Sequence, residues 1–240
     1  MGLPSLNPGM ELLHTTPAWC APFILSQGFK VTKQQNLGRR LGNGIYVTSR
    51  METVALFNMG FLVKCQLTRP LKVLWLKEYD PKVINSLKRE FGKQILTNSF
   101  HKAIPRNKQL KQKELIELVS YFVSKKDKRR DWWNWNNWTY FTRHIKRHGF
   151  DAVGQIDHNY EELLIHNPSS LKVISIHRFD ATYEWVDNDI AMKKATIGDE
   201  LTIRQLKALA WKEMREIYEG DDEIDKWGQD IINRLKSLNV

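Results

Sequence analysis

Three short segments of the chain carry side chains that are suited to catalysis or ligand binding. The first contains His14, the second Tyr46 and the third Glu162. An imidazole donates and accepts hydrogen bonds, a phenol ring offers a flat face for stacking, and a carboxylate favours positive charge that develops in a transition state. Taken singly, each also has an ordinary structural explanation: a histidine at a strand end, a turn into a strand, and a solvated glutamate that opens a strand.

The order and the surroundings of these residues are more specific than the residues alone. The three segments are LLHTTP at 12–17, GNGIYVTS at 42–49 and YEELLIHNPSSLKV at 160–173. The second segment lacks the third glycine and the following helix of a dinucleotide-binding fingerprint, so a Rossmann fold explains it poorly.

Together the segments resemble the ADP-ribosyltransferase superfamily, in the branch with a His-Tyr-Glu triad. That branch includes diphtheria-like toxins, poly(ADP-ribose) polymerases and bacterial polymorphic toxins. The stretch KRHGFDAV at 146–153 also resembles the family's approach to its glutamate strand. The resemblance covers about residues 10–76 and 143–176. It implies an α+β fold with a split antiparallel β-sheet core, which here carries a helical insertion and a helical C-terminal extension.

The resemblance implies that the catalytic residues are Glu162, Tyr46 and His14. Glu162 would hold the 2′-hydroxyl of the nicotinamide ribose of NAD and favour the oxocarbenium-like state in which the nicotinamide–ribose bond breaks. Tyr46 would stack on the nicotinamide, with Phe57 on the other face, and His14 would hydrogen-bond the adenosine-side ribose.

Three further residues are candidates for NAD binding, Thr15 by the same resemblance and two arginines by their position. Thr15 stands where the family prefers glycine, and it would bind the carboxamide through its main chain. Arg39 and Arg40 precede the strand of Tyr46 and are placed to neutralise the NAD diphosphate, although an exposed basic loop explains them equally well.

The choice between two adjacent glutamates rests on the register of the third segment. Counting six residues back from Pro168 gives Glu162 rather than Glu161, as in the family pattern. Arginine-modifying members carry Glu or Gln two residues before the catalytic glutamate. Here that position is Tyr160, which argues against arginine as the acceptor.

Positive charge is concentrated in the middle of the chain. The whole chain has a formal net charge of +10, whereas residues 64–150 alone carry +14. Within that block, five basic residues lead into a tryptophan-rich stretch at 132–138. This stretch fits a helix face packed on the core as well as it fits a platform where bases stack and cations follow the phosphates. The candidate nucleic-acid contacts are Lys125, Lys126, Lys128, Arg129, Arg130, Trp132 and Trp133.

The spacing of hydrophobic residues predicts the positions of strands and helices. Strands are predicted at 10–14, 45–48, 62–67, 71–76, 152–156, 162–166 and 171–176, and helices at 22–25, 52–59, 201–218 and 223–238. Ser49 is expected to cap the helix at 52–59. We expect a catalytic domain at 1–179, with the insertion at about 80–145, and a helical extension at 180–240.

Several kinds of protein are excluded or disfavoured by composition. Cys20 and Cys65 are the two cysteines of the chain, too few for a disulfide framework or a thiolate zinc site. The seven histidines form no zinc-hydrolase motif, so we expect no metal. Without an eighteen-residue apolar run or secretory-signal features, a cytoplasmic protein with no membrane partner is expected.

The resulting hypothesis is an NAD-dependent mono-ADP-ribosyltransferase, a toxin or phage-defence effector that modifies single-stranded RNA or DNA. Three alternatives stay open: a protein acceptor, an NAD glycohydrolase, and a non-catalytic nucleic-acid-binding protein on the same fold. A neutralising antitoxin partner is implied by analogy.

Overall fold

The computed structural model describes residues 6–31, 44–57, 59–75, 142, 145–156, 161–186, 189–218 and 226–238. The fold is of the predicted α+β class, with two four-stranded sheets and several helices. The chain divides into two compact units. The first comprises Met1–Leu6, Val31–Tyr46 and Pro70–Asn167, and the second comprises Asn7–Lys30, Val47–Arg69 and Pro168–Val240.

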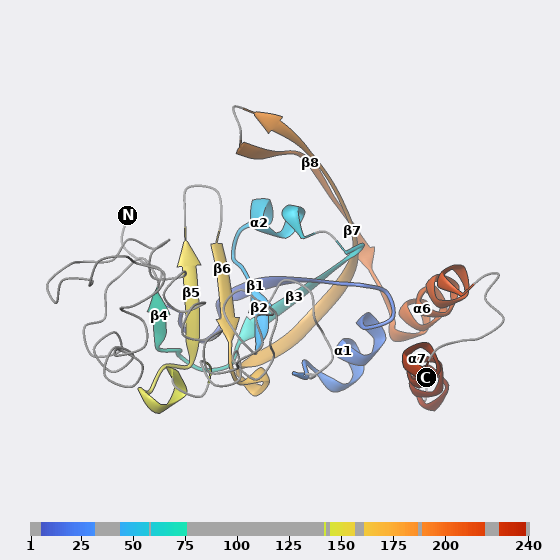
Figure 1. Ribbon diagram of the computed structural model, residues 1–240, viewed down its shortest axis with the longest axis horizontal. Coiled ribbons are helices and arrows are strands. Elements are labelled where there is room, and N and C mark those ends of the chain that lie inside the picture. Colours follow the sequence, from blue (N-terminus) through green and yellow to red (C-terminus); the bar gives the residue numbers. More distant parts are fainter. Residues whose placement is uncertain are drawn as a thin grey trace, which may run out of the picture. The chain divides into compact units, whose positions relative to one another are not determined.

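The first unit contains a sheet with the strand order β2-β6-β5-β4 (Figure 1). Its strands are β2 (Ile45–Val47), β4 (Val73–Trp75), β5 (Ala152–Ile156) and β6 (Glu161–Ile165). β5 and β6 are antiparallel, whereas β4 and β5 are parallel. The expectation of a wholly antiparallel core is therefore wrong for this pair. Every residue of β6 is buried, as an inner strand with two covered faces requires.

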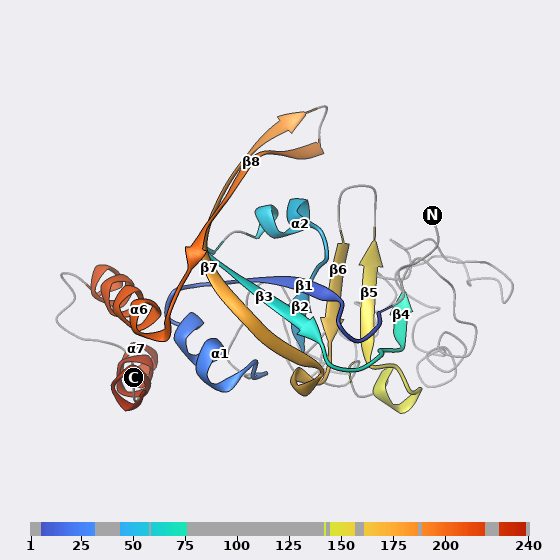
Figure 2. The same ribbon diagram turned by 180° about the vertical axis from the view of Figure 1, so that it is seen from behind.

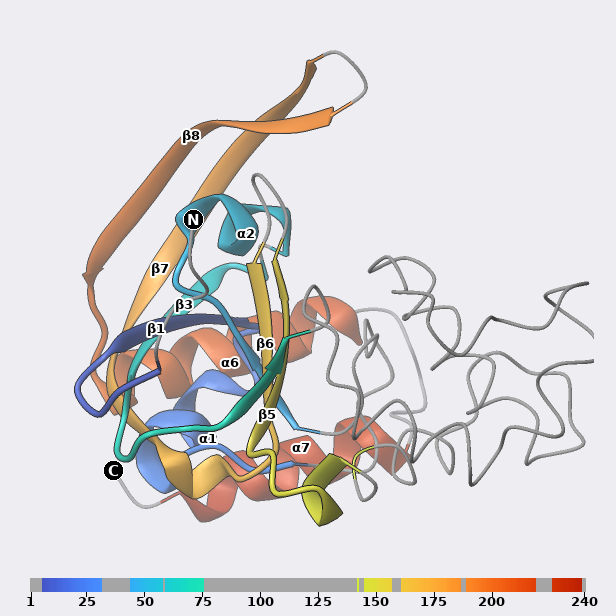
Figure 3. The same cartoon turned by 90° about the vertical axis from the view of Figure 1, so that its left-hand side faces the viewer.

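The second unit contains an antiparallel sheet with the order β1-β3-β7-β8. Its strands are β1 (Glu11–Thr16), β3 (Phe61–Leu67), β7 (Leu171–Val186) and β8 (Asp189–Glu200). The pairing of β7 with β3 runs from Leu171 to Arg178. Beyond that point β7 and β8 continue as a two-stranded ribbon, which extends away from the other strands of this sheet (Figures 2 and 3).

This ribbon differs from the expectation for residues 171–200. The strand predicted at 171–176 continues to Val186, so the expected domain boundary at 179 falls inside β7. Residues 189–200 form β8 rather than part of a helical extension, which begins at Ile203. The reason is that backbone pairing between two consecutive antiparallel strands stabilises the ribbon, and such pairing does not require a continuous apolar run in the sequence.

The helices of the second unit begin and end close to their predicted positions. They are α1 (Ala21–Gln27), α2 (Met51–Leu56), α6 (Ile203–Ile217) and α7 (Lys226–Ser237). α6 starts at a reciprocal capping box between Thr202 and Gln205. Figure 1 shows α1, α6 and α7 gathered together, and their buried side chains form one apolar cluster: Phe23, Ala210, Met214, Ile231, Leu235 and Leu238.

The start of α2 corrects a sequence-based expectation. The N-cap is Arg50 and not Ser49, and its side chain makes no capping hydrogen bond. The Arg50 backbone N–H donates instead to the Thr48 hydroxyl at 3.0 Å. The preceding turn is therefore stabilised by the residue that follows β2, a local alternative that serine and threonine hydroxyls commonly offer.

Glu213 on α6 has a carboxylate whose charge is unfavourable in the folded chain. Burial raises the pKa of this carboxyl, the Ala18 backbone N–H that it accepts opposes the shift, and the nearby charge of Glu216 adds to it. A raised pKa means that ionisation destabilises the fold above the folded-state pKa. This loss of folding stability disappears below the ordinary pKa of glutamate, where the carboxyl is protonated in both the folded and the unfolded chain.

Glu213→Gln should therefore raise the melting temperature at pH 7 relative to the unmodified chain. Glutamine removes the charge and keeps an oxygen that can accept from Ala18. The difference should shrink to nothing near pH 3.5, which thermal unfolding at both pH values measures. An equal difference at both pH values would show that packing, and not ionisation, sets the effect.

Candidate active site

Tyr46 and Glu162, which are far apart in sequence, lie on neighbouring strands of the first unit. Tyr46 is the central residue of β2, and Glu162 is the second residue of β6. These two strands are hydrogen-bonded neighbours in the sheet. Neighbouring strands are about 4.8 Å apart, so the strands that carry the two residues lie side by side in the sheet.

Gly44, directly before β2, lies very close to β6. A Cβ at Gly44 would lie 2.7 Å from Cδ1 of Leu164 and would collide with the Ile165 carbonyl oxygen. Only glycine permits this close approach of the chain at the start of β2 to β6.

The two adjacent glutamates of β6 have opposite orientations. Glu161 is 2% exposed and Glu162 is 6% exposed, and they pair with Ile156 and Gln155 of β5. Alternation sends their carboxylates to opposite faces of the sheet. Charged side chains are almost never fully buried unless paired, and both glutamates interact with other groups of the chain.

His14 belongs to the second unit, near the end of β1. It pairs with Val63 of β3, and its ring lies perpendicular to the ring of Phe29, with 5.3 Å between ring centroids. Perpendicular aromatic pairs of this kind are favourable. The contact with Phe29 was not predicted, because nothing in the sequence pattern links a residue after a short helix to a histidine on the preceding strand.

Thr15 and Phe57 are also brought together within the second unit. The Thr15 hydroxyl donates to the Phe57 carbonyl oxygen at 2.7 Å. Phe57 is 37% exposed, so part of its ring is accessible for stacking. The hydrogen bond uses the Thr15 side chain and the Phe57 main chain, and it ties β1 to the end of α2.

The remaining predicted site residues lie outside the described part of the chain. They are Arg39, Arg40, Lys125, Lys126, Lys128, Arg129, Arg130, Trp132 and Trp133. Their assignments to NAD and nucleic acid remain sequence-based predictions.

Cys65 is held in an unreactive state. Its thiol is buried and donates to the Leu12 carbonyl oxygen at 3.3 Å. Burial, with a smaller contribution from the charge of Glu11, raises its pKa to about 12. The thiolate is the reactive species, so Cys65 is unsuited to nucleophilic catalysis at neutral pH.

We therefore expect iodoacetamide at pH 8 to modify the half-exposed Cys20 and to spare Cys65 in the folded protein. Mass spectrometry should detect a single adduct before denaturation and a double adduct after it. Rapid double labelling of the native chain would contradict the burial of Cys65.

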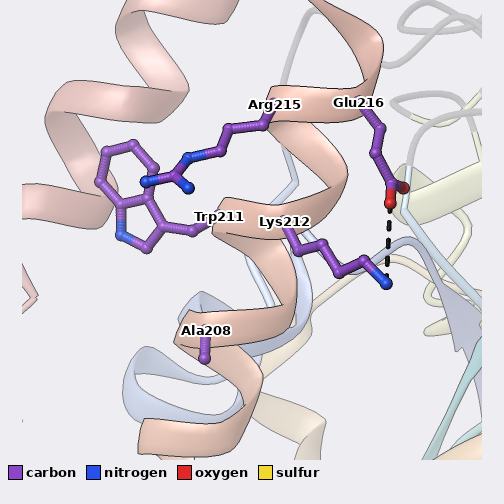
Figure 4. A pocket seen from close by; sticks show the side chains of 5 residues that line it. All are labelled: Ala208, Trp211, Lys212, Arg215 and Glu216. Atoms are coloured by element: carbon purple, nitrogen blue, oxygen red, sulfur yellow. Dashed lines mark ion pairs between the residues drawn. The ribbon is translucent and has the colours of Figure 1, made fainter. Parts of the chain in front are cut away.

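A surface hollow on α6 was not anticipated from the sequence. It is lined by Ala208, Trp211, Lys212, Arg215 and Glu216, all from the same helix (Figure 4). Lys212 and Glu216 form an ion pair at 3.7 Å with largely exposed side chains. Exposed pairs of this kind contribute little free energy, and the hollow contains none of the candidate site residues.

The described ranges contain neither a cluster of metal-ligating side chains nor a membrane-spanning helix. Among these residues, no three or more His, Cys, Asp or Glu side chains are arranged to hold a metal ion. None of the helices there has the length and apolar character needed to cross a membrane.

No family model matches the chain, and no curated protein matches its sequence. A solved structure described as the crystal structure of an anti-CRISPR protein aligns with 72% of this chain and 100% of that chain, with 14% sequence identity and a TM-score of 0.35. Similarity at this level does not establish a shared fold.

Proposed function

We propose that this chain is an NAD-dependent mono-ADP-ribosyltransferase of the His-Tyr-Glu type. The observation that carries the proposal is the adjacency of β2 and β6, which brings Tyr46 beside the strand of the buried Glu162. The resembled motifs require an aromatic ring and a carboxylate at one site. The sequence separates the two residues by more than a hundred positions, so their adjacency is a property of the fold.

The chemistry follows from these residue types. The glycosidic bond between nicotinamide and ribose breaks, nicotinamide leaves with the bonding electrons, and C1 of the ribose gains oxocarbenium character. The Glu162 carboxylate accepts a hydrogen bond from the ribose 2′-hydroxyl and stabilises this positive charge. Tyr46 stacks on the departing nicotinamide ring. A nucleophilic oxygen or nitrogen of the acceptor then attacks C1 and releases a proton.

We propose nucleic acid as the acceptor on the basis of charge. The net charge of +14 in residues 64–150 exceeds that of the whole chain. Binding of lysine and arginine to phosphates supplies most non-specific affinity for nucleic acids, and tryptophan adds base stacking. This basic block lies between the Tyr46 and Glu162 segments in the sequence. The residues that would bind the acceptor are therefore flanked along the chain by the residues that would bind NAD.

The test is to incubate the protein with NAD labelled in the adenylate, together with single-stranded RNA, single-stranded DNA and cell-extract protein. Label in the nucleic-acid fraction is the expected result. Label in protein alone would overturn the acceptor assignment, and free ADP-ribose alone would indicate a glycohydrolase. Intact NAD and no label in any fraction would refute the enzymatic proposal. Nucleic-acid binding without NAD turnover would then favour the non-catalytic alternative.

A further inference from the structure

The C-terminal helices have no part in the function proposed so far, although they pack on the segment that follows the His14 strand. We propose that α6 and α7 position the His14 ring for NAD binding, acting through α1 and Phe29. This inference rests on the proposed function, because it assigns His14 to the NAD site. All of these residues belong to the second unit, in which their mutual contacts are described.

The first link joins α6 and α7 to α1. Phe23 of α1 is 8% exposed and shares an apolar cluster with residues of both C-terminal helices, including Met214 and Leu235. The Arg234 guanidinium of α7 lies 4.4 Å from the centroid of the Phe23 ring, close enough for a cation–π interaction. α1 has seven residues and is too short to be stable alone, so this packing fixes its position.

The turn between β1 and α1 is held from the same side. Trp19 packs perpendicular to Trp227 of α7, with 5.6 Å between ring centroids. The Ala18 backbone N–H donates to the Glu213 carboxylate of α6. The C-terminal helices therefore contact both the turn that precedes α1 and α1 itself.

The second link joins α1 to His14. α1 ends at Gln27 and is capped by Gly28, which has a φ of 72° and whose N–H donates to the Ile24 carbonyl at 2.9 Å. The next residue, Phe29, is 7% exposed and meets the His14 ring edge-on at 5.3 Å. Because Phe29 follows the end of α1 directly, the position of α1 determines where the Phe29 ring lies against His14.

The expected consequence is a change in NAD affinity and not in the chemical step. His14 is assigned to the ribose on the adenosine side, away from the bond that breaks. A residue that orients His14 contributes equally to ground-state and transition-state binding, so its loss raises KM and leaves kcat nearly unchanged. Phe29 is therefore a positioning residue.

Phe29→Leu keeps most of the apolar volume and removes the ring. We expect a KM for NAD about 3- to 10-fold higher, in line with the strength of aromatic pairs, with kcat within about twofold of the unmodified chain. Phe29→Tyr keeps the ring and should restore the KM. In the double variant with His14→Ala, Phe29→Leu should have no further effect, because coupled residues are not additive. Full additivity would refute action through His14.

Leu235→Ala tests whether the packing of α7 on α1 affects NAD binding. Leu235 is completely buried on α7, so the substitution should loosen the support of α1 and raise the KM for NAD. The matched control is Leu67→Ala. Leu67 is a 2% exposed leucine at the end of β3, where it pairs with Leu171. The residue of β3 that pairs with His14 is Val63, nearer the other end of the strand. Both variants should lose thermal stability, and only Leu235→Ala should change KM. An equal change in KM for both, or none for Leu235→Ala, would refute the role of the C-terminal helices.

A binding-independent measurement separates this proposal from the proposed function. The Phe29 ring lies 5.3 Å from the His14 ring, so its ring current should displace the His14 NMR signal. That signal should therefore shift in Phe29→Leu and in Leu235→Ala but not in Leu67→Ala. If the unmodified chain neither binds nor cleaves NAD, the proposed function fails whatever these spectra show. If NAD is cleaved but the His14 signal is the same in all variants, the positioning role fails alone.

Discussion

Glu162→Gln is expected to reduce the transfer of ADP-ribose by about 100- to 1,000-fold, the range seen when one charge-stabilising group is removed from an active site. Glutamine has nearly the same shape but carries no charge to oppose the oxocarbenium-like state. The side chain is 6% exposed in β6, so an isosteric replacement should leave the melting temperature close to that of the unmodified chain. The measurement is the initial rate of label transfer at saturating NAD, with thermal unfolding alongside.

Glu161→Gln is the matched control for this experiment. The residue is one position away in the same strand and is equally buried, but its carboxylate projects from the opposite face. Its replacement should leave the transfer rate within about threefold of the unmodified chain. If Glu161→Gln abolishes transfer and Glu162→Gln does not, the register of the third motif is wrong and Glu161 is the catalytic carboxylate.

Gly44→Ala is expected to have the second largest effect on the transfer of ADP-ribose, because it displaces β2 from β6. The added methyl group would collide with the Ile165 carbonyl oxygen and with Leu164 of β6. A backbone atom cannot move aside as a side-chain tip can, so β2 must shift away from β6. Overpacking of this kind costs about 1–3 kcal/mol of stability. Displacing Tyr46 relative to Glu162 by about 1 Å should lower the transfer rate by up to about 100-fold.

Gly198→Ala provides a comparison for Gly44→Ala. A Cβ at Gly198 would approach Arg178 Cβ at 3.4 Å, an ordinary van der Waals contact. This variant should therefore retain both its melting temperature and its transfer rate. Thermal unfolding and the label-transfer assay on both variants measure the contrast. Equal stability of the two variants would show that β2 and β6 tolerate a side chain at Gly44.

Much of the local structure could be predicted because short-range patterns encode it. Strands β1, β2, β3, β5 and β6 lie within one or two residues of their predicted positions, since runs of apolar and β-branched residues favour extended backbone. α1 ends before Gly28 as predicted, since its φ of 72° suits glycine. Helices α6 and α7 followed from apolar residues at three- and four-residue spacing.

Other parts of the fold were not predicted from the sequence pattern. The predictions missed β8, the second half of β7 and the parallel pairing of β4 with β5. The pairing of β4 with β5 joins segments remote in sequence, whereas β7 and β8 are consecutive strands that pair with each other without a continuous apolar run. The prediction that Ser49 caps α2 is also wrong, because the Thr48 hydroxyl accepts a hydrogen bond from the Arg50 backbone N–H.

The sequence by itself determined the order of the three motifs, the residue types at His14, Tyr46 and Glu162, and the concentration of positive charge between the last two. The tertiary structure alone decided that β2 lies beside β6, that Gly44 must lack a side chain there, and that Phe29 meets His14. The physical reason is that residue types and periodicity are local properties of the chain. Which side chains meet depends on strand pairing and close packing among residues that only folding brings together.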